Sequence, residues 1–137
     1  MDWRECHQKR LAKPVAVDHH LVTALRNQSE KRLLSYEMMP LTEVSASSKV
    51  SLLYDSVREL LEALAITRGF KIYNHECYCP FLKEVIHDSS LGDVFDRLRK
   101  IRNGIHYYGE DIRMQEAQEI LQKLHFLRKK IQALLPS

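Results

Sequence analysis

Seven apolar residues between positions 50 and 64 recur at the spacing of one helix face. They are Val50, Leu53, Tyr54, Val57, Leu60, Leu61 and Leu64. Side chains three, four and seven positions apart lie on one side of an α-helix, so this stripe predicts an amphipathic helix from about Lys49 to Thr67. Gly69 follows, and a glycine there typically adopts the left-handed conformation that ends a helix. A helix of this kind needs partner elements to cover its apolar side.

Four further helices are expected from similar stripes and from capping residues. Their expected ranges are residues 18–39, 73–87, 91–103 or beyond, and 112–135. Asp18 is expected to cap the first of them, and Ser89 or Ser90 the third. The apolar residues expected to be buried are Leu21, Ala24, Leu25, Leu33 and Leu34 in the first helix, Leu91, Val94, Phe95, Leu98 and Ile101 in the third, and Ala117, Ile120, Leu121, Leu124, Leu127, Ile131 and Leu134 in the last.

Two residues disturb these predicted helices. Pro80 lies inside the 73–87 segment, which Asn74 is expected to cap, so that helix either kinks at Pro80 or begins after Cys79. Gly104 either bends or ends the helix that begins near Leu91.

The composition favours an all-α protein. The chain has 137 residues, among them only 4 Gly and 4 Pro, which is few for a β fold with many turns. No segment predicts a convincing strand, and the connections are short, so we expect an up-and-down bundle of about five helices. A single domain is expected over residues 14–137, and the polar residues 1–13 are expected to form a flexible N-terminal segment.

The cysteines and the lack of long apolar runs bear on location. There are 3 Cys, an odd number, and no secretory signal or apolar run long enough for a membrane span. We therefore expect free thiols, a cytoplasmic protein and no membrane association. His75, Cys77 and Cys79 suggest zinc, but residues two apart on a helix point in different directions, so we expect no metal and no cofactor.

The segment from Arg97 to Tyr108 carries the residues best suited to chemistry. Arg99, Arg102 and His106 are related by three and seven positions, which places them along one stripe of a helix. Three cations in a row repel one another unless an anion lies between them, and phosphate is the obvious anion. The neighbouring residues expected to contact RNA or a nucleotide are Arg97, Lys100, Asn103 and Tyr107. The formal net charge of +3 permits such a ligand without demanding it.

Such a stripe suits cleavage of RNA without metal. The 2′-hydroxyl of RNA can attack the adjacent phosphate when an imidazole acts as general acid or base and guanidinium groups stabilise the developing charge. His106 is the candidate acid or base, and Arg99 or Arg102 the candidate phosphate clamp. A symmetric dimer would bring a second histidine to the site.

Two segments resemble the HEPN superfamily: Leu52–Leu64 and Arg99–Gly109, together with the Gly69–His75 link. The resemblance covers roughly residues 18–135 and implies a helical bundle that is commonly dimeric. Many members are metal-independent endoribonucleases, often toxins paired with a nucleotidyltransferase antitoxin. The signature is an arginine, a polar residue and a later histidine.

On this resemblance His106 matches the signature histidine. Tyr108 matches a tyrosine that the partner enzyme modifies in some toxins. Arg102 and Asn103 match the Arg-polar pair, but only three residues separate Arg102 from His106, and the signature has four to six. Arg99 has six residues before His106 and satisfies this spacing, but Lys100 follows it. Which arginine serves the motif stays open.

Plainer interpretations stand beside these. The basic residues could form a solvated face paired with Asp93, Asp96 or Glu110. His106 could cap the helix, and the two tyrosines could serve packing. The function is accordingly either catalysis or binding of nucleotide, RNA or a nucleotidyltransferase without catalysis, and a purely structural role is the third possibility.

Overall fold

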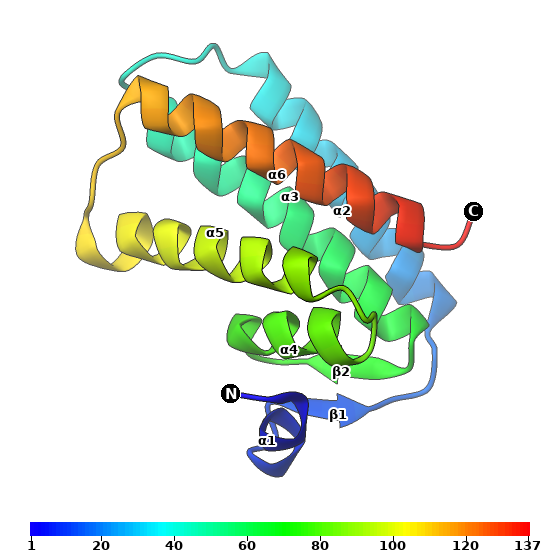
Figure 1. Ribbon diagram of the computed structural model, residues 1–137. Helices are drawn as coiled ribbons and strands as arrows, with labels where there is room; N and C mark the ends of the chain where they lie inside the picture. Colours follow the sequence, from blue (N-terminus) through cyan, green and yellow to red (C-terminus); the bar gives the residue numbers. More distant parts are fainter.

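The computed structural model describes residues 1–137 as a bundle of helices with one small sheet (Figure 1). In chain order the elements are α1 (Trp3–Gln8), β1 (Ala12–Pro14), α2 (His19–Met38), α3 (Ala46–Thr67), β2 (Phe70–Ile72), the 3-10 turn η1 (His75–Cys77), α4 (Tyr78–Glu84), α5 (Ser89–Tyr108) and α6 (Met114–Leu134). The predicted all-α class is confirmed. Six helices are present because α1 adds to the predicted set.

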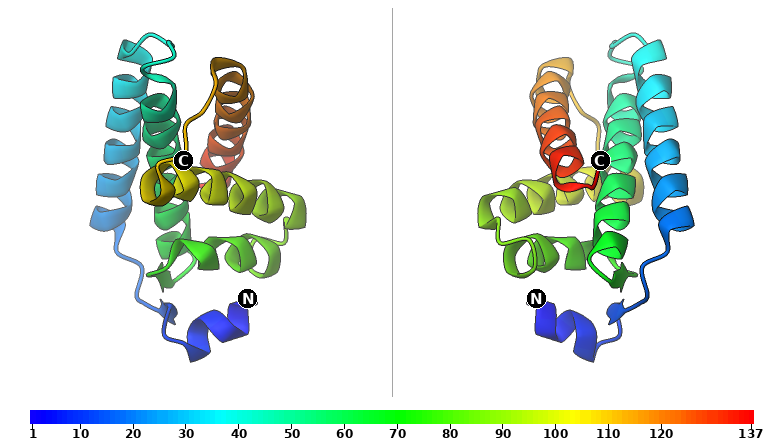
Figure 2. Two further views of the ribbon diagram at one scale, coloured as in Figure 1. Left: turned by 90° about the vertical axis from the view of Figure 1, so that its left-hand side faces the viewer. Right: turned by 90° about the vertical axis from the view of Figure 1, so that its right-hand side faces the viewer.

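The helices form two groups that run in different directions. α2, α3 and α6 lie lengthwise beside one another, and α4 and α5 run across them (Figure 2). α3 is the central helix, because it packs against α2, α5, α6 and β2. Most of its residues are buried, including the whole predicted stripe from Val50 to Leu64. A helix that is apolar on most sides is stable only when it is covered in this way.

Two predicted helix boundaries are confirmed. The Asp18 carboxylate caps α2 by accepting a hydrogen bond from the backbone N–H of Leu21 at 3.0 Å. Gly69 ends α3 with a φ of +85°. The prediction for α2 is wrong at Ala24 and Leu34, which are both exposed, while the α5 and α6 stripes are buried or packed against the core as predicted.

The N-cap of α5 differs from the prediction. Asp88, not Ser89 or Ser90, caps this helix by accepting from the backbone N–H of Leu91 at 3.0 Å. A carboxylate accepts that bond as well as a hydroxyl does. Of the two expected C-terminal ends, the longer one is present: α5 continues through Gly104, and Gly109 ends it with a φ of +64°.

The predicted helix over residues 73–87 is shorter in the structure. Tyr73 lies outside any helix, η1 forms a single 3-10 turn, and α4 begins at Tyr78. Asn74 does act as a cap, accepting from the backbone N–H of Glu76 at 2.9 Å. Pro80 lies in the first turn of α4, where its missing N–H costs no intrahelical hydrogen bond, so it causes no kink.

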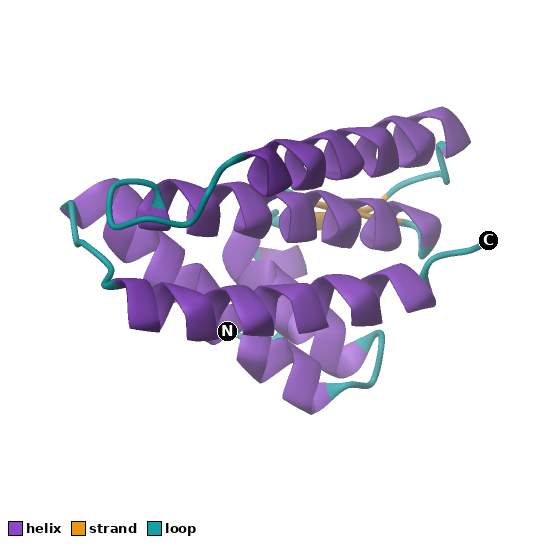
Figure 3. Ribbon diagram, turned by 90° about the horizontal axis from the view of Figure 1, so that it is seen from above, coloured by secondary structure: helices purple, strands orange, loops and turns teal.

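Residues 1–14 form an ordered segment, which we call the N-terminal arm. The prediction that residues 1–13 fray is wrong, since they form α1 and most of β1. β1 pairs antiparallel with β2, with Ala12 opposite Ile72. These two strands, which the sequence did not predict, occupy little of the fold (orange in Figure 3). Their pairing ties the arm to the end of α3.

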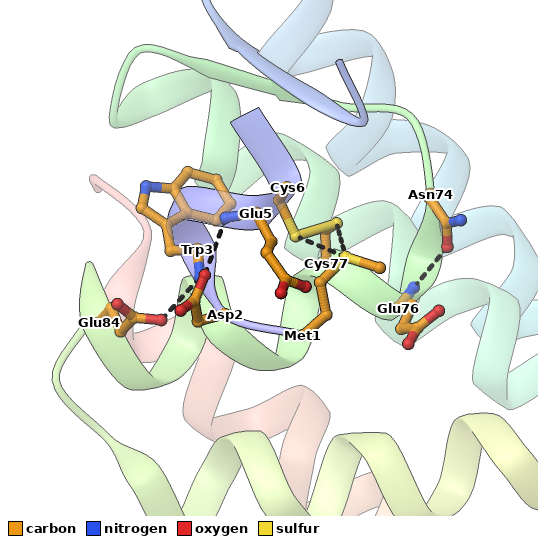
Figure 4. Close-up of a disulfide and its surroundings, with 9 residues drawn as sticks. All are labelled: Met1, Asp2, Trp3, Glu5, Cys6, Asn74, Glu76, Cys77 and Glu84. Carbon is orange, nitrogen blue, oxygen red and sulfur yellow. Dashed lines mark hydrogen bonds between the residues drawn. A yellow bond between two sulfur atoms is a disulfide. The ribbon is translucent and has the colours of Figure 1, made fainter. Parts of the chain in front are cut away.

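A disulfide between Cys6 and Cys77 joins the N-terminal arm to η1 (Figure 4). Both cysteines are completely buried, and the sulfur of Met1 lies 3.5 Å from the sulfur of Cys6. The prediction of free thiols is therefore wrong for this pair and holds only for Cys79. The cytoplasmic location stays a prediction that no longer rests on free thiols.

A buried polar cluster links the three lengthwise helices. Ser29 of α2 donates to the backbone carbonyl of Ser56 of α3 at 2.7 Å, and Ser56 donates back to the Ser29 carbonyl at 2.8 Å. Nε of Arg128 on α6 donates to the Ser56 hydroxyl at 2.9 Å. Because buried polar groups must be paired, this cluster fixes how the helices align. None of the helices combines the length and apolar character that a membrane crossing requires.

Candidate functional site: a polar pocket between α5 and the η1 turn

A polar pocket of about 250 Å³ lies between α5 and the segment that follows β2. We call it the arginine pocket. Its lining residues are Tyr73, Asn74 and His75 on one side and Arg99, Arg102, Asn103 and Tyr107 on the other. Four of the predicted site residues thus meet three residues that sequence reasoning did not assign to the site.

Local structure explains how the first side of the pocket is held. β2 ends at Ile72, and the backbone N–H of Tyr73 donates to the carbonyl of Leu11 at 2.8 Å. The Asn74 cap then turns the chain into η1, whose first residue is His75. The N-terminal arm therefore supports this side of the arginine pocket through β1 and through the disulfide.

Arg102 is one of two largely covered arginines of the pocket, and it lies against α3. Its guanidinium carbon lies 5.2 Å from the centre of the Tyr54 ring, and Nη2 lies 3.5 Å from Oδ1 of Asp55. Its side chain is only 14% exposed. Nε of Arg102 is buried and has no hydrogen-bond partner within the chain. A buried donor without an acceptor is costly, about 1–3 kcal/mol, so a ligand oxygen at this place would be favoured.

Arg99 is already paired. Its Nε and Nη2 lie 3.0 and 2.9 Å from Oδ1 of Asp96. Lys100 reaches the other oxygen of the same carboxylate at 3.4 Å. The interpretation of the basic stretch as a face paired with acids is therefore confirmed for Arg99 and Lys100. Arg99 keeps donors on Nη1, so it can still contribute to the arginine pocket.

His75 joins the pocket to the core. Its Nδ1 lies 3.3 Å from the hydroxyl of Tyr54. Burial, together with the positive charges of Arg58 and Arg102, lowers the pKa of His75 to about 4. Burial also raises the pKa of Tyr54 well above its ordinary value. Both side chains are therefore neutral at pH 7, and each offers one donor and one acceptor.

His106 lies in a different hollow. It is exposed in the last turn of α5, beside Ser47, Ser48 and Ser51 of α3, in a hollow of about 410 Å³. We call this the serine hollow. The predicted stripe of two arginines and a histidine is thus divided: Arg99 and Arg102 share the arginine pocket, and His106 does not line it.

The structure also places Arg97, Tyr108 and the His75–Cys77–Cys79 run. Arg97 and Tyr108 are exposed and line neither the arginine pocket nor the serine hollow. The His75–Cys77–Cys79 run is not a free set of metal ligands, because Cys77 is bonded to Cys6. No group of three His, Cys, Asp or Glu residues is placed to hold a metal ion.

Sequence reasoning missed His75, Tyr54 and Asp55 as parts of the site. Tyr54 was interpreted as a core residue of α3, and its ring is indeed completely buried. The only available signal was the polar run Tyr73-Asn74-His75 after a short apolar segment. Comparison of the chain with family models, with curated proteins and with solved structures finds no match.

Proposed function

We propose that this chain is a HEPN-type domain that binds RNA by holding a phosphate in the arginine pocket. The observation that carries the proposal is Arg102, whose guanidinium is partly exposed in the pocket and whose buried Nε has no acceptor within the chain. Phosphate oxygens accept hydrogen bonds from guanidinium groups in a bidentate manner. Arg99, on the same helix face, adds a second cation.

Binding to RNA in low salt tests this proposal. A fluorescein-labelled single-stranded RNA is titrated with the protein, and fluorescence anisotropy gives the Kd. Arg102→Met keeps an unbranched apolar side chain but removes the guanidinium and its donors, so we expect Kd to rise by about 10-fold or more. The slope of log Kobs against log salt should become shallower by about 0.7.

Lys123→Ala is the matched control, because it removes an exposed positive charge from α6. We expect its Kd to stay near that of the unmodified protein. Equal Kd values for Arg102→Met and Lys123→Ala would contradict the proposal.

Metal-independent cleavage of RNA is the second candidate function. It is favoured by the exposure of His106, which lies one turn beyond Arg102 on α5. In this reaction the imidazole removes the proton of a 2′-hydroxyl, whose oxygen attacks the adjacent phosphorus. A 2′,3′-cyclic phosphate forms, and the departing 5′-oxygen takes a proton from an acid. The second histidine of a homodimer would supply that acid.

Cleavage is tested with RNA in the presence of a chelator. We expect products that end in a 2′,3′-cyclic phosphate and their loss in His106→Ala. His20→Ala removes an exposed histidine of α2 and serves as control. Intact RNA with the unmodified protein would leave binding as the function. A mass in solution of twice 16.1 kDa is expected for the homodimer.

A nucleotidyltransferase is the proposed protein partner in the catalytic version. Tyr108, which is 78% exposed, is accessible to such an enzyme. Incubation with a candidate nucleotidyltransferase and labelled nucleotide, with Tyr108→Phe as control, tests this modification.

A further inference from the structure

Two exposed tyrosines border the arginine pocket. Tyr107 of α5 is 70% exposed and Tyr73, after β2, is 53% exposed, and both line the pocket that contains Arg102. Nζ of Lys13, from the N-terminal arm, lies 5.7 Å from the centre of the Tyr73 ring. An exposed aromatic ring by itself is ordinary, but these two rings lie beside the cations of one polar pocket.

We infer that the arginine pocket is a subsite for one unpaired nucleotide of single-stranded RNA, whose base stacks on Tyr107 while Arg102 holds the phosphate. This inference rests on the proposed function and names its substrate class. Every base has a π face, so stacking on a tyrosine tolerates any sequence. The ring of Tyr73 is less available, because Lys13 already lies over it.

The remaining lining residues suit the other parts of a nucleotide. Asn74, His75 and Asn103 place amide and imidazole groups in the same pocket. Such groups can donate to and accept from a base edge or a 2′-hydroxyl. The volume of about 250 Å³ is smaller than a typical site for a drug-sized ligand, so only a small part of an RNA chain can enter the pocket.

A duplex does not fit the same subsite. Bases inside a double-stranded RNA are paired and stacked on one another, and the narrow major groove keeps side chains from their edges. A duplex can meet the arginines only through its backbone. The subsite therefore predicts a preference for single strands that depends on Tyr107 and not on the charge of the protein.

Anisotropy titrations of a fluorescein-labelled ten-nucleotide RNA, alone and annealed to its complement, test this inference. Base stacking contributes about 1–3 kcal/mol per base, so Tyr107→Leu should raise the Kd for the single strand by about 5- to 150-fold. Tyr107→Phe keeps the ring and should bind like the unmodified protein. The Kd for the duplex should be the same for all three proteins.

Tyr108→Leu is the matched control, because Tyr108 is the next residue, is equally exposed and does not line the pocket. We expect no change in its Kd for either probe. If RNA binds and Arg102→Met weakens binding, but Tyr107→Leu matches Tyr108→Leu, the stacking subsite is wrong and the proposed function stands. If Tyr107→Phe binds as weakly as Tyr107→Leu, the hydroxyl and not the ring is responsible, which also overturns it. If the unmodified protein binds no RNA, both proposals fail.

Discussion

The Cys6–Cys77 disulfide closes a loop between residues 71 positions apart. A cross-link of this kind stabilises a protein mainly because it restricts the unfolded chain. For a loop of about 70 residues the chain-entropy relation gives about 4.4 kcal/mol at about 25 °C. Reduction should therefore lower the free energy of unfolding by about 4 kcal/mol, which is a large part of the stability of a small domain.

Urea unfolding with and without a reductant measures this effect. A protein of this size has an m value of about 1–3 kcal/mol/M, so the urea midpoint should fall by about 2 M on reduction. The double variant Cys6→Ala/Cys77→Ala should behave like the reduced protein, with a further loss for the small cavities. Cys79→Ser, which leaves the disulfide intact, is the control.

The arm has its own probe, since Trp3 is the only tryptophan. Its ring packs 5.2 Å from the ring of Phe70 and 5.6 Å from that of Phe81, between centroids. In the oxidised protein, tryptophan fluorescence and circular dichroism should report one common transition. After reduction both should move to lower urea.

Two results would refute this reasoning. One is the reaction of three thiols, instead of the single thiol of Cys79, when the denatured protein is titrated without reductant. The other is an unchanged midpoint for both probes after reduction, because the cross-link would then contribute nothing to the free energy of unfolding.

Three further predictions concern other parts of the structure. The pKa of His75 is about 4 in the folded protein and ordinarily 6.5. Between pH 4 and 6.5, His75 is therefore protonated in the unfolded chain and neutral in the folded one. The free energy of unfolding should therefore fall by about 1–2 kcal/mol as pH drops from about 6.5 to 4, after allowing for solvent screening. In urea unfolding, His75→Asn should show a shallower fall, and the same pH dependence in both proteins would contradict the role of His75. Ser29→Ala should lower the free energy of unfolding by about 1–2 kcal/mol. Ser56→Ala should lower it more, because the Ser56 hydroxyl also accepts from a buried arginine of α6. Equal losses for the two variants in thermal unfolding would argue against the cluster. Gly104→Ala should stabilise α5 by about 0.5–1 kcal/mol in the same assay, since only the flexible carboxylate of Glu110 must move, and a loss of stability would show that this carboxylate is held in place.

The long helices could be predicted because their signals are local. The stripe on α3 repeats within a few residues, and so do those on α5 and α6, which the structure buries as expected. The predicted helix ends were less accurate than the predicted stripes, since several neighbouring residues can cap a helix equally well. Asp88 and Ser89 illustrate this, because only one of them takes the N-cap position.

The N-terminal arm could not be predicted in the same way. Its residues are polar and show no periodicity, and their order comes from contacts with distant residues, among them partners 60 and 71 positions later. Ala12 pairs with Ile72, and Cys6 bonds to Cys77. Neither partner is visible from the arm alone.

The arginine pocket combines both kinds of information. Helical spacing by itself predicted that Arg99, Arg102 and His106 lie along one stripe of α5, because the turn of a helix is the same in any protein, and the pocket contains the two arginines of that stripe. Only the tertiary structure decided that His75 and Tyr54 meet them there and that His106 opens into a separate hollow. Periodicity places side chains around one axis, but the neighbours of those side chains depend on how distant segments pack, and that packing is settled by burial and hydrogen bonding over the whole chain.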